Sequence, residues 1–314
     1  MKIINNTTIP KKYKGSAIVI GNFDGLHRGH QKIFNQAKQH AIKNSINFGV
    51  LTFSPLPIMF FNKSIKNYKL VSNEQKFRLF KKYGVNFIIN IKFNKIFSKI
   101  KAEKFINNII FRRISPSLIF VSNNFRFGYR RKGNVKMLQK LSKKYNYRLI
   151  NTKAFKHKKK IISSTLIRKS LQNGHLDLAN TLLSRTWFIE GVVKRGKKLG
   201  KKLGYPTCNI NIKNYVLPKI GIYTVKVLIG KNKKIFNGIA YLGYRPTFDG
   251  KEIVLEVNIF GIKKNLYKKI LRVYFLKFIR GEQKFRNSTS LMRQMNKDVI
   301  IAKKSLKTKL VLYE

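Results

Sequence analysis

The chain has 314 residues, of which 43% are hydrophobic and 12% aromatic, and this composition supplies two buried cores and excludes an intrinsically disordered protein. Its single cysteine, Cys208, excludes an internal disulfide framework. No apolar stretch approaches the roughly 20 residues of a membrane span, and the N-terminus lacks the apolar core of a signal peptide. We therefore expect a cytoplasmic protein without membrane contact. The formal net charge of +57, from 68 Lys+Arg against 11 Asp+Glu, is spread along the whole chain rather than gathered in one stripe with stacking aromatic residues, which favours base-composition drift at tolerant surface positions over a nucleic-acid site.

The first half of the chain alternates between apolar β-type runs and amphipathic stretches. Strands are expected at 17–20, 48–53, 87–91, 118–121 and 147–150, and helices near 30–43, 73–83, 102–110, 134–144 and 165–172. Such alternation predicts an α/β Rossmann-like domain, with a parallel sheet covered by helices on both faces. We assign residues 1–184 to this domain.

The pattern changes near residue 184. Strands are expected at 188–193, 223–229, 235–242, 253–259 and 271–278, separated by Gly-rich turns without intervening helices. This pattern predicts an antiparallel β-barrel over residues 185–314. A terminal helix is expected to begin at Ser288, with Leu291, Met295, Val299 and Ile300 on one side.

Two of the five histidines lie where the first expected strand opens onto a helix. The segment after residues 17–20 reads Gly21-Asn22-Phe23-Asp24-Gly25-Leu26-His27-Arg28-Gly29-His30. A strand–turn–helix corner of this kind is where α/β proteins bind phosphates, because the helix N-terminus favours anions. A single histidine would more often be packed or solvated, but two of them around Gly29 favour a functional site.

Three later segments also carry candidate chemistry. Ser163-Ser164-Thr165 precedes an expected helix and offers hydroxyl groups to phosphates, with an ordinary helix cap as the alternative. Glycines recur at 196, 200 and 204 in a basic segment that is able to wrap phosphates, although no Walker motif is present and a surface turn is the alternative. Glu256 lies in an apolar strand and is a candidate general base, unless it is an exposed carboxylate paired with a lysine.

These segments resemble, in order, the motifs of bacterial bifunctional riboflavin kinase/FMN adenylyltransferases, also called FAD synthetases. The motifs are the histidine segment, Phe125-Arg126-Phe127-Gly128, Ile162-Ser163-Ser164-Thr165-Leu166-Ile167-Arg168, Gly204-Tyr205-Pro206-Thr207-Cys208-Asn209, Leu255-Glu256-Val257 and Phe278-Ile279-Arg280-Gly281-Glu282-Gln283-Lys284-Phe285. Together they run from about residue 15 to residue 286. One His-x-Gly-His motif is weak support, whereas an ordered set across two modules is hard to obtain by chance.

The resemblance implies that the first module transfers adenylyl from ATP to FMN. His27 and His30 would then contact phosphate oxygens as catalytic residues, and Arg168 would bind the leaving pyrophosphate. The implied nucleotide-binding set is Gly21, Asn22, Phe23, Asp24, Gly25, Gly29, Asn124, Ser163, Ser164 and Thr165.

The resemblance implies that the second module phosphorylates riboflavin. Glu256 would be the catalytic base, and Thr207 and Asn209 would hold Mg²⁺, a hard cation that accepts hydroxyl and amide oxygens alongside substrate phosphates. The implied ATP-binding set is Gly196, Gly200, Gly204 and Pro206, and the implied flavin-binding set is Arg280, Glu282 and Phe285.

Four positions depart from the family pattern. Ser122 replaces a usual glycine, Asn258 and Gly261 stand where a histidine and an aspartate are frequent, and Lys268 stands where glycine is usual. If the position of Ser122 needs a positive φ angle, serine would strain that loop.

The leading hypothesis is a bifunctional enzyme that makes FMN from riboflavin and FAD from FMN, with ATP as the second substrate of both steps and Mg²⁺ as the cofactor. One alternative keeps only one of the two activities. A second alternative, from another class, is a nucleic-acid-binding protein on a nucleotidyltransferase fold. The sequence leaves the oligomeric state unassigned, and the expected partners are small molecules rather than a specific nucleic acid.

Overall fold

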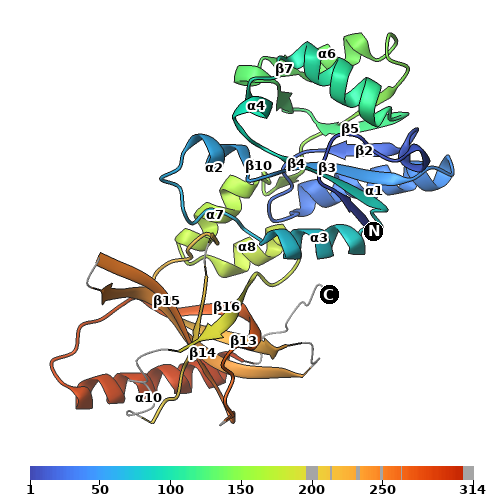
Figure 1. Ribbon diagram of the computed structural model, residues 1–314. Helices are drawn as coiled ribbons and strands as arrows, with labels where there is room; N and C mark the ends of the chain where they lie inside the picture. Colours follow the sequence, from blue (N-terminus) through green and yellow to red (C-terminus); the bar gives the residue numbers. More distant parts are fainter. Residues whose placement is uncertain (196–203, 213, 231–233, 248–249, 263, 307–314) are drawn as a thin grey trace. The chain divides into compact units, whose positions relative to one another are not determined.

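A computed structural model describes residues 1–314 apart from 196–203, 213, 231–233, 248–249, 263 and 307–314 (Figure 1). The described chain forms two compact units. The first consists of Met1–Lys66 and Asn73–Ser163, and the second of Asn67–Ser72 and the chain from Ser164 onward. The domain boundary that the sequence analysis sets at residue 184 stays a prediction.

The first unit is built on a six-stranded sheet in which every neighbouring pair is parallel. The strand order is β1-β4-β3-β2-β5-β8. The strands are β1 (Lys2–Ile4), β2 (Ala17–Ile20), β3 (Phe48–Ser54), β4 (Phe87–Lys92), β5 (Leu118–Ser122) and β8 (Arg148–Thr152). The expected parallel sheet is therefore confirmed, and β1, a three-residue edge strand, is added to it.

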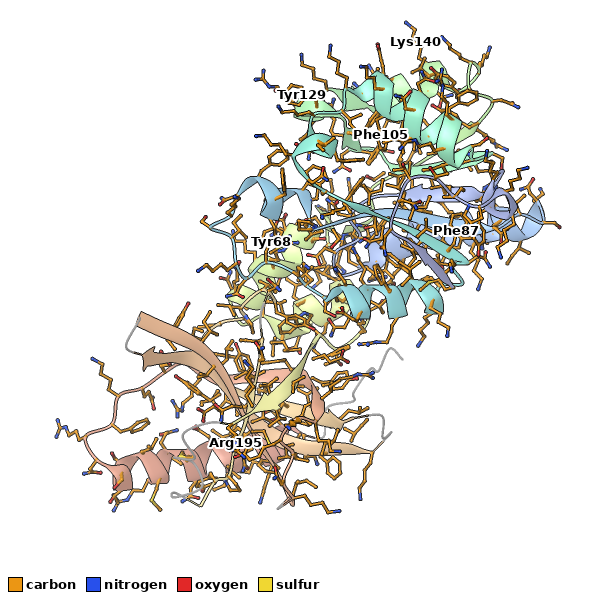
Figure 2. All side chains as sticks on the ribbon, in the orientation of Figure 1. Tyr68, Phe87, Phe105, Tyr129, Lys140 and Arg195 are labelled. Carbon is orange, nitrogen blue, oxygen red and sulfur yellow. The ribbon has the colours of Figure 1, made fainter. Side chains whose placement is uncertain are left out.

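Helices cover both faces of this sheet, as expected. The α-helices are α1 (Arg28–Lys43), α2 (Pro57–Phe61), α3 (Asn73–Lys82), α4 (Lys95–Ser98), α5 (Ala102–Lys104) and α6 (Val135–Leu141). On one face, Phe34 of α1 packs against Phe48 of β3 and Phe80 of α3, with ring centroids 5.7 and 5.2 Å apart. On the other, a π-helix (Phe105–Ile114) packs into a core that includes Phe87 of β4; Phe87 and Phe105 are labelled in Figure 2.

The π-helix differs from the regular helix expected at 102–110. The N–H of Ser115 donates to the carbonyl of Ile110, five residues back, at 2.7 Å. The helix continues past residue 110 to Ile114, and its wider turn places Ile109, Ile110 and Ile114 in the core. Apolar spacing alone does not distinguish a π-turn from an α-turn.

The first unit also contains two small hairpins. One pairs β6 (Arg126–Phe127) with β7 (Gly133–Asn134), and the other pairs β9 (Lys156–His157) with β10 (Lys160–Ile161). Each strand has only two residues, which is too short for an alternation pattern to reveal in the sequence.

The second unit is a closed antiparallel barrel flanked by helices. The strand order is β11-β12-β15-β14-β13-β16. The strands are β11 (Phe188–Lys194), β12 (Cys208–Ile210), β13 (Gly221–Ile229), β14 (Ile235–Thr247), β15 (Gly250–Ile259) and β16 (Ile270–Arg280), and the helices are α7 (Ser164–Gln172), α8 (Leu176–Leu183) and α10 (Ser288–Ser305). The expected barrel and terminal helix are confirmed, whereas β12 and α8 were not predicted. Among the described helices, none is long and apolar enough to cross a membrane.

Trp187 ties α8 and the 67–72 segment to the barrel. Its indole is 1% exposed and packs against Phe275 of β16, with ring centroids 5.2 Å apart. Its backbone N–H donates to the side-chain oxygen of Asn180 in α8, and its indole N–H donates to the carbonyl of Leu70, both at 2.8 Å. These contacts explain why both segments belong to the second unit.

The buried side of α10 agrees with the expected apolar side except at one residue. Leu291, Met295 and Val299 are half-buried, and Asp298 and Ala302, on the same side of the helix, are buried. The Asp298 carboxylate pairs there with the guanidinium of Arg280 at 2.7 Å. Ile300 is 55% exposed, so the expectation for it was wrong, because nine residues of α-helix place it opposite Leu291.

Backbone conformation distinguishes two of the departures from the family pattern. Ser122 does not have a positive φ angle, so serine causes no left-handed strain there. Lys268, in contrast, has φ 63°, in the left-handed region that favours glycine.

We predict that Lys268→Gly raises the free energy of unfolding of the barrel by about 0.5–1 kcal/mol. The change removes about 1–2 kcal/mol of left-handed strain and adds a smaller entropic cost. Denaturant titration followed by fluorescence of the single tryptophan measures it. The matched control is Lys269→Gly, at an exposed position without a positive φ, which should lower stability by about 0.5–1 kcal/mol. Equal effects of the two changes would contradict the prediction.

Candidate active sites

The first candidate site lies at the carboxyl end of β2. This strand is fully buried and lies between β3 and β5, where the strand order changes direction. Ligands of open α/β sheets bind in the crevice at such a point. Helix α1 begins at Arg28, only eight residues after β2 ends, so its N-terminus lies at this edge.

His27 and His30 lie together at the start of α1. His27 is the N-cap residue, and His30 is in the first helical turn. Their imidazole rings are stacked, with centroids 3.7 Å apart and planes 20° apart. Phe23 meets the His30 ring edge-on at 5.2 Å. The expected pair of imidazoles is therefore brought together at a helix N-terminus.

Burial sets the charge state of His30. It holds the pKa of His30 well below its ordinary value of 6.5, and the neighbouring His27 imidazole lowers it further. The Nδ1 atom of His30 is buried and has no hydrogen-bond partner among the described residues. His30 is thus a neutral imidazole at pH 7, and its Nδ1 atom is available for a hydrogen bond with a ligand.

Gly29 has a packing role in this arrangement. A Cβ atom added there would lie 3.2 Å from the His27 ring, which is closer than side chains normally approach. Gly21 has a similar role, because a Cβ atom there would lie 2.8 Å from the ring of Phe23. Gly25 takes the left-handed conformation, with φ 82°. These glycines were expected to let the backbone approach a nucleotide, and two of them also leave room for neighbouring rings.

The remaining residues expected in the first site lie on separate elements. Asn22 is exposed and Asp24 is buried in the turn after β2. Asn124 lies just after β5, and its side-chain oxygen accepts a hydrogen bond from the Ser122 hydroxyl at 2.8 Å. Ser163 ends the first unit.

Ser164, Thr165 and Arg168 belong to the second unit, on α7. Ser164 is the first residue of that helix. Arg168 is 7% exposed, and its guanidinium stacks on the Tyr68 ring at 3.7 Å from the centroid (Tyr68 is labelled in Figure 2). Its Nε donates to the Tyr68 carbonyl at 2.8 Å, so the plane of the guanidinium is fixed.

The second candidate site lies on the barrel, where three strands place polar residues side by side. In the ladder, Glu256 of β15 is opposite Asn209 of β12 on one side and Tyr241 of β14 on the other. Directly opposite residues point to the same face of a sheet. Leu255 and Val257 are buried in the barrel, so the three polar residues share the opposite face.

The expected metal ligands are close to Glu256. The Thr207 hydroxyl donates to the Glu256 carboxylate at 3.3 Å. The side-chain oxygen of Asn209 is buried and has no hydrogen-bond partner among the described residues. An orphaned amide oxygen beside a hydroxyl and a carboxylate is a donor set that suits Mg²⁺. Among the described residues, no three His, Cys, Asp or Glu side chains gather as a metal site.

Asn258, which stands where the family often has a histidine, holds the segment before Thr207. Its side-chain amide donates to the Pro206 carbonyl at 2.7 Å. Gly204 has φ 81° and an exposed position. Gly196 and Gly200 lie outside the described residues.

Tyr241 is a residue that sequence reasoning missed. Its hydroxyl donates to the Glu282 carboxylate. Burial raises the pKa of Tyr241, and the hydrogen bond to Glu282 and the charges of Glu282 and Glu256 raise it further. Gly243 leaves room for this contact, because a Cβ atom there would overlap the hydroxyl. Only the strand register, which apolar alternation does not encode, places Tyr241 beside Glu256.

Arg280 and Phe285, expected to bind flavin, lie together. The guanidinium lies 5.8 Å from the centroid of the Phe285 ring. It also donates to Asp298 through Nε and Nη2 and to the Gly281 carbonyl through Nη1, at 2.7–3.1 Å. Three of its nitrogen atoms thus have partners within the protein, which fixes the chain leading to Glu282.

Comparisons with known proteins match both units. Residues 9–166 match the family model of FAD synthetase, and residues 183–306 match that of riboflavin kinase. A bifunctional riboflavin kinase/FMN adenylyltransferase of Buchnera aphidicola subsp. Schizaphis graminum is 38% identical over 308 residues, covering 97% of this chain and 98% of the relative. The proteins of the same name from Haemophilus influenzae and Escherichia coli K12 are 36% and 32% identical over 290 residues, covering 92% of this chain and 94% and 92% of those relatives.

A solved structure resembles nearly the whole chain. The crystal structure of the macrolide-efflux protein from Streptococcus pneumoniae has a TM-score of 0.83 and 27% sequence identity, and the match covers 96% of this chain and 98% of that one. The match extends over both the parallel sheet and the barrel.

We predict that His30 titrates well below pH 6.5 in the folded protein. The unfolded imidazole takes up a proton below about pH 6.5 and the folded one only at lower pH, so His30 lowers the free energy of unfolding as the pH falls below that value. Nuclear magnetic resonance titration of the five histidines measures it, with His30→Asn identifying the signal. A midpoint at or above 6.5 for the signal lost in that variant would contradict the prediction.

Proposed function

This chain belongs to the bifunctional riboflavin kinase/FMN adenylyltransferase family, and from that premise we propose which of its residues carry each reaction. It phosphorylates riboflavin to FMN with ATP, and it adenylylates FMN with ATP to give FAD and pyrophosphate. The observation that carries this function is that each module matches its own family over nearly all of its length. Flavins and pyrophosphate separated by chromatography after incubation with riboflavin and ATP test it directly.

For adenylyl transfer, the proposed centre is the histidine pair. A phosphate oxygen of FMN attacks the α-phosphorus of ATP and pyrophosphate leaves, so the site must stabilise growing negative charge. The stacked rings of His27 and His30 and the N-terminus of α1 support this role. The low pKa of His30 makes it a neutral hydrogen-bond donor in the free protein. An arriving phosphate would raise that pKa.

The other proposed nucleotide-binding residues include hydroxyl groups and one guanidinium. Ser164 begins α7, so its hydroxyl and the first amides of that helix are suited to bind phosphate oxygens. Arg168 is proposed to bind the leaving pyrophosphate, and its stacking on Tyr68 supports this by fixing the orientation of the guanidinium. The other proposed members are Gly21, Asn22, Phe23, Asp24, Gly25, Gly29, Asn124, Ser163 and Thr165.

For riboflavin phosphorylation, the proposed base is Glu256. It would take the proton of the riboflavin hydroxyl that attacks the γ-phosphorus of ATP. Its hydrogen bond with Thr207 and its register beside Asn209 support this role. Mg²⁺ is the proposed cofactor, held by Thr207 and Asn209, and when bound it would neutralise phosphate charge. Arg280, Glu282 and Phe285 are proposed flavin-binding residues.

The high positive charge is proposed to have no specific nucleic-acid partner. The 68 Lys+Arg residues are distributed along the chain, which supports a diffuse field rather than a binding stripe. The cytoplasm is the proposed compartment, supported by the single cysteine.

Replacing His27 and His30 with Ala should stop FAD formation while FMN accumulates from riboflavin. The change removes groups that stabilise the transition state, and we expect the adenylylation rate to fall by about 10² to 10³ or more. Chromatography of the flavin products measures both steps in one reaction. His157→Ala, in the β9 hairpin, is the control and should change neither rate by more than about twofold. Loss of both activities in a folded histidine variant would contradict the assignment to two separate sites.

Glu256→Gln should have the opposite effect. Glutamine is nearly isosteric but a poor proton acceptor, so we expect riboflavin phosphorylation to fall by about 10² to 10⁴ while added FMN is still converted to FAD. Glu190→Gln, another barrel-strand carboxylate, which pairs with Arg272 at 2.7 Å, is the matched control and should keep the kinase rate. Unchanged phosphorylation in Glu256→Gln would move the base elsewhere.

A further inference from the structure

The turn between β2 and α1 has an unfavourable backbone. Phe23 and Leu26 both take left-handed conformations, with φ 51° and 37°, although neither is a glycine. Side chains with a Cβ atom disfavour that region, so such residues persist only where the surroundings fix them. Because His27 follows this turn directly, any relaxation of it would move the histidine pair.

Contacts at both ends hold the turn in place. The rings of Phe23 and Phe80 are in edge-to-face contact at 6.0 Å, and Phe23 is 2% exposed. At the far end, the side-chain amide of Gln31 donates to the Leu26 carbonyl at 2.9 Å. At the near end, the hydroxyl of Thr52 donates to the Asn22 carbonyl at 3.2 Å.

Thr52 is in turn bound by a buried lysine. Thr52 is fully buried on β3, and its hydroxyl oxygen accepts a hydrogen bond from the ammonium of Lys76 on α3 at 3.2 Å. Lys76 is 3% exposed, and it is the only buried lysine among the residues that the structure describes. A charged donor strengthens the hydrogen bonds of the hydroxyl that it binds.

The burial of Lys76 is unusual for a lysine. Removing an ammonium from water is unfavourable, so lysines normally keep their charge at the surface. In a chain whose other described lysines are exposed or half-buried, this one lies on the face of the sheet that α1 and α3 cover. Its hydrogen bond to the Thr52 hydroxyl connects the Lys76 ammonium to the backbone of the Asn22–Leu26 turn, because Thr52 donates to the Asn22 carbonyl.

We propose that Lys76 is a positioning residue for adenylyl transfer, which acts through the Thr52 hydroxyl to hold the Asn22–Leu26 turn and so the histidine pair. The inference rests on the proposed role of His27 and His30. In this role Lys76 acts through Thr52 rather than on a reacting atom. Its effect is on the placement of the groups that stabilise the transition state.

A positioning role predicts a specific kinetic signature. Misplacing catalytic groups by about 1 Å costs about 10²-fold in rate, whereas ground-state binding of ATP is shared among many contacts. Lys76→Met should therefore lower kcat for FMN adenylylation by about 10- to 100-fold, with the KM for ATP within about threefold of the original value. Riboflavin phosphorylation by the same chain is the internal control and should be unchanged.

The experiment compares paired variants of the full chain. Thr52→Val removes the hydroxyl and should reproduce the loss of kcat, whereas Thr52→Ser keeps the hydroxyl and should retain most of the rate. Combining Lys76→Met with Thr52→Val should be little worse than Thr52→Val alone, because Lys76 acts on the turn through the Thr52 hydroxyl. Lys81→Met, at an exposed position on α3, is the matched control for loss of a charge and should be silent.

The outcomes separate this inference from the proposed function. Circular dichroism first establishes that the Lys76→Met and Thr52→Val variants are folded. A kcat within twofold of the original in both folded variants would overturn the inference. If Lys76→Met does not fold, the Thr52 pair decides, since equal rates for valine and serine would also overturn it. FAD formation that survives replacement of both histidines would instead overturn the proposed function, whatever Lys76 does.

Discussion

The parallel pairing of β2 with β3 and β5 is the constraint on which the first unit depends. Hydrogen bonding on both sides fixes the strand, and the amide of Gly21 extends this by donating to the Leu51 carbonyl at 3.1 Å. The chain must then reverse within a few residues to start α1 over the same sheet. The left-handed residues of the turn are the consequence, and the proximity of His27 to His30 follows from where the helix begins. The geometry of the candidate site is thus set by the sheet rather than by the histidines.

Strand register has the same importance in the barrel. Glu256 lies between Asn209 and Tyr241 because β15 pairs with β12 and β14 in one particular register. A shift of one residue would turn Glu256 into the barrel and bring Leu255 to the polar face. Burial of Leu255 and Val257 therefore protects the alignment of the polar residues as well as stabilising the fold.

Sequence patterns predicted what depends on local periodicity and left out what depends on pairing. The strands at 17–20 and 188–193 and the helix from Ser288 were predicted because their apolar spacing is internal to each segment. The strand β12 has only three residues and follows a motif whose spacing indicates a turn, so nothing local marks it. The hydrogen-bond partners of Tyr241 and Lys76 lie 41 and 24 residues away in the sequence. A local sequence pattern does not reveal contacts at that separation.

The rare carboxylates show how charge and fold are connected in this chain. Asp298 is one of 11 acidic residues against 68 basic ones, and it is 2% exposed. It binds Arg280 through two nitrogen atoms and also accepts from Gln294 at 2.9 Å, so its negative charge is balanced inside the protein. Because Arg280 precedes Glu282, this pair fixes the start of the segment that contains the proposed flavin-binding residues. Removing Asp298 would leave Arg280 as a partly buried cation with no counter-charge, and the surrounding excess of lysines would supply none. The ion pair with Arg280 therefore gives Asp298 a structural role. Glu256, in contrast, lies beside Thr207, Asn209 and Tyr241 on the polar face of the barrel.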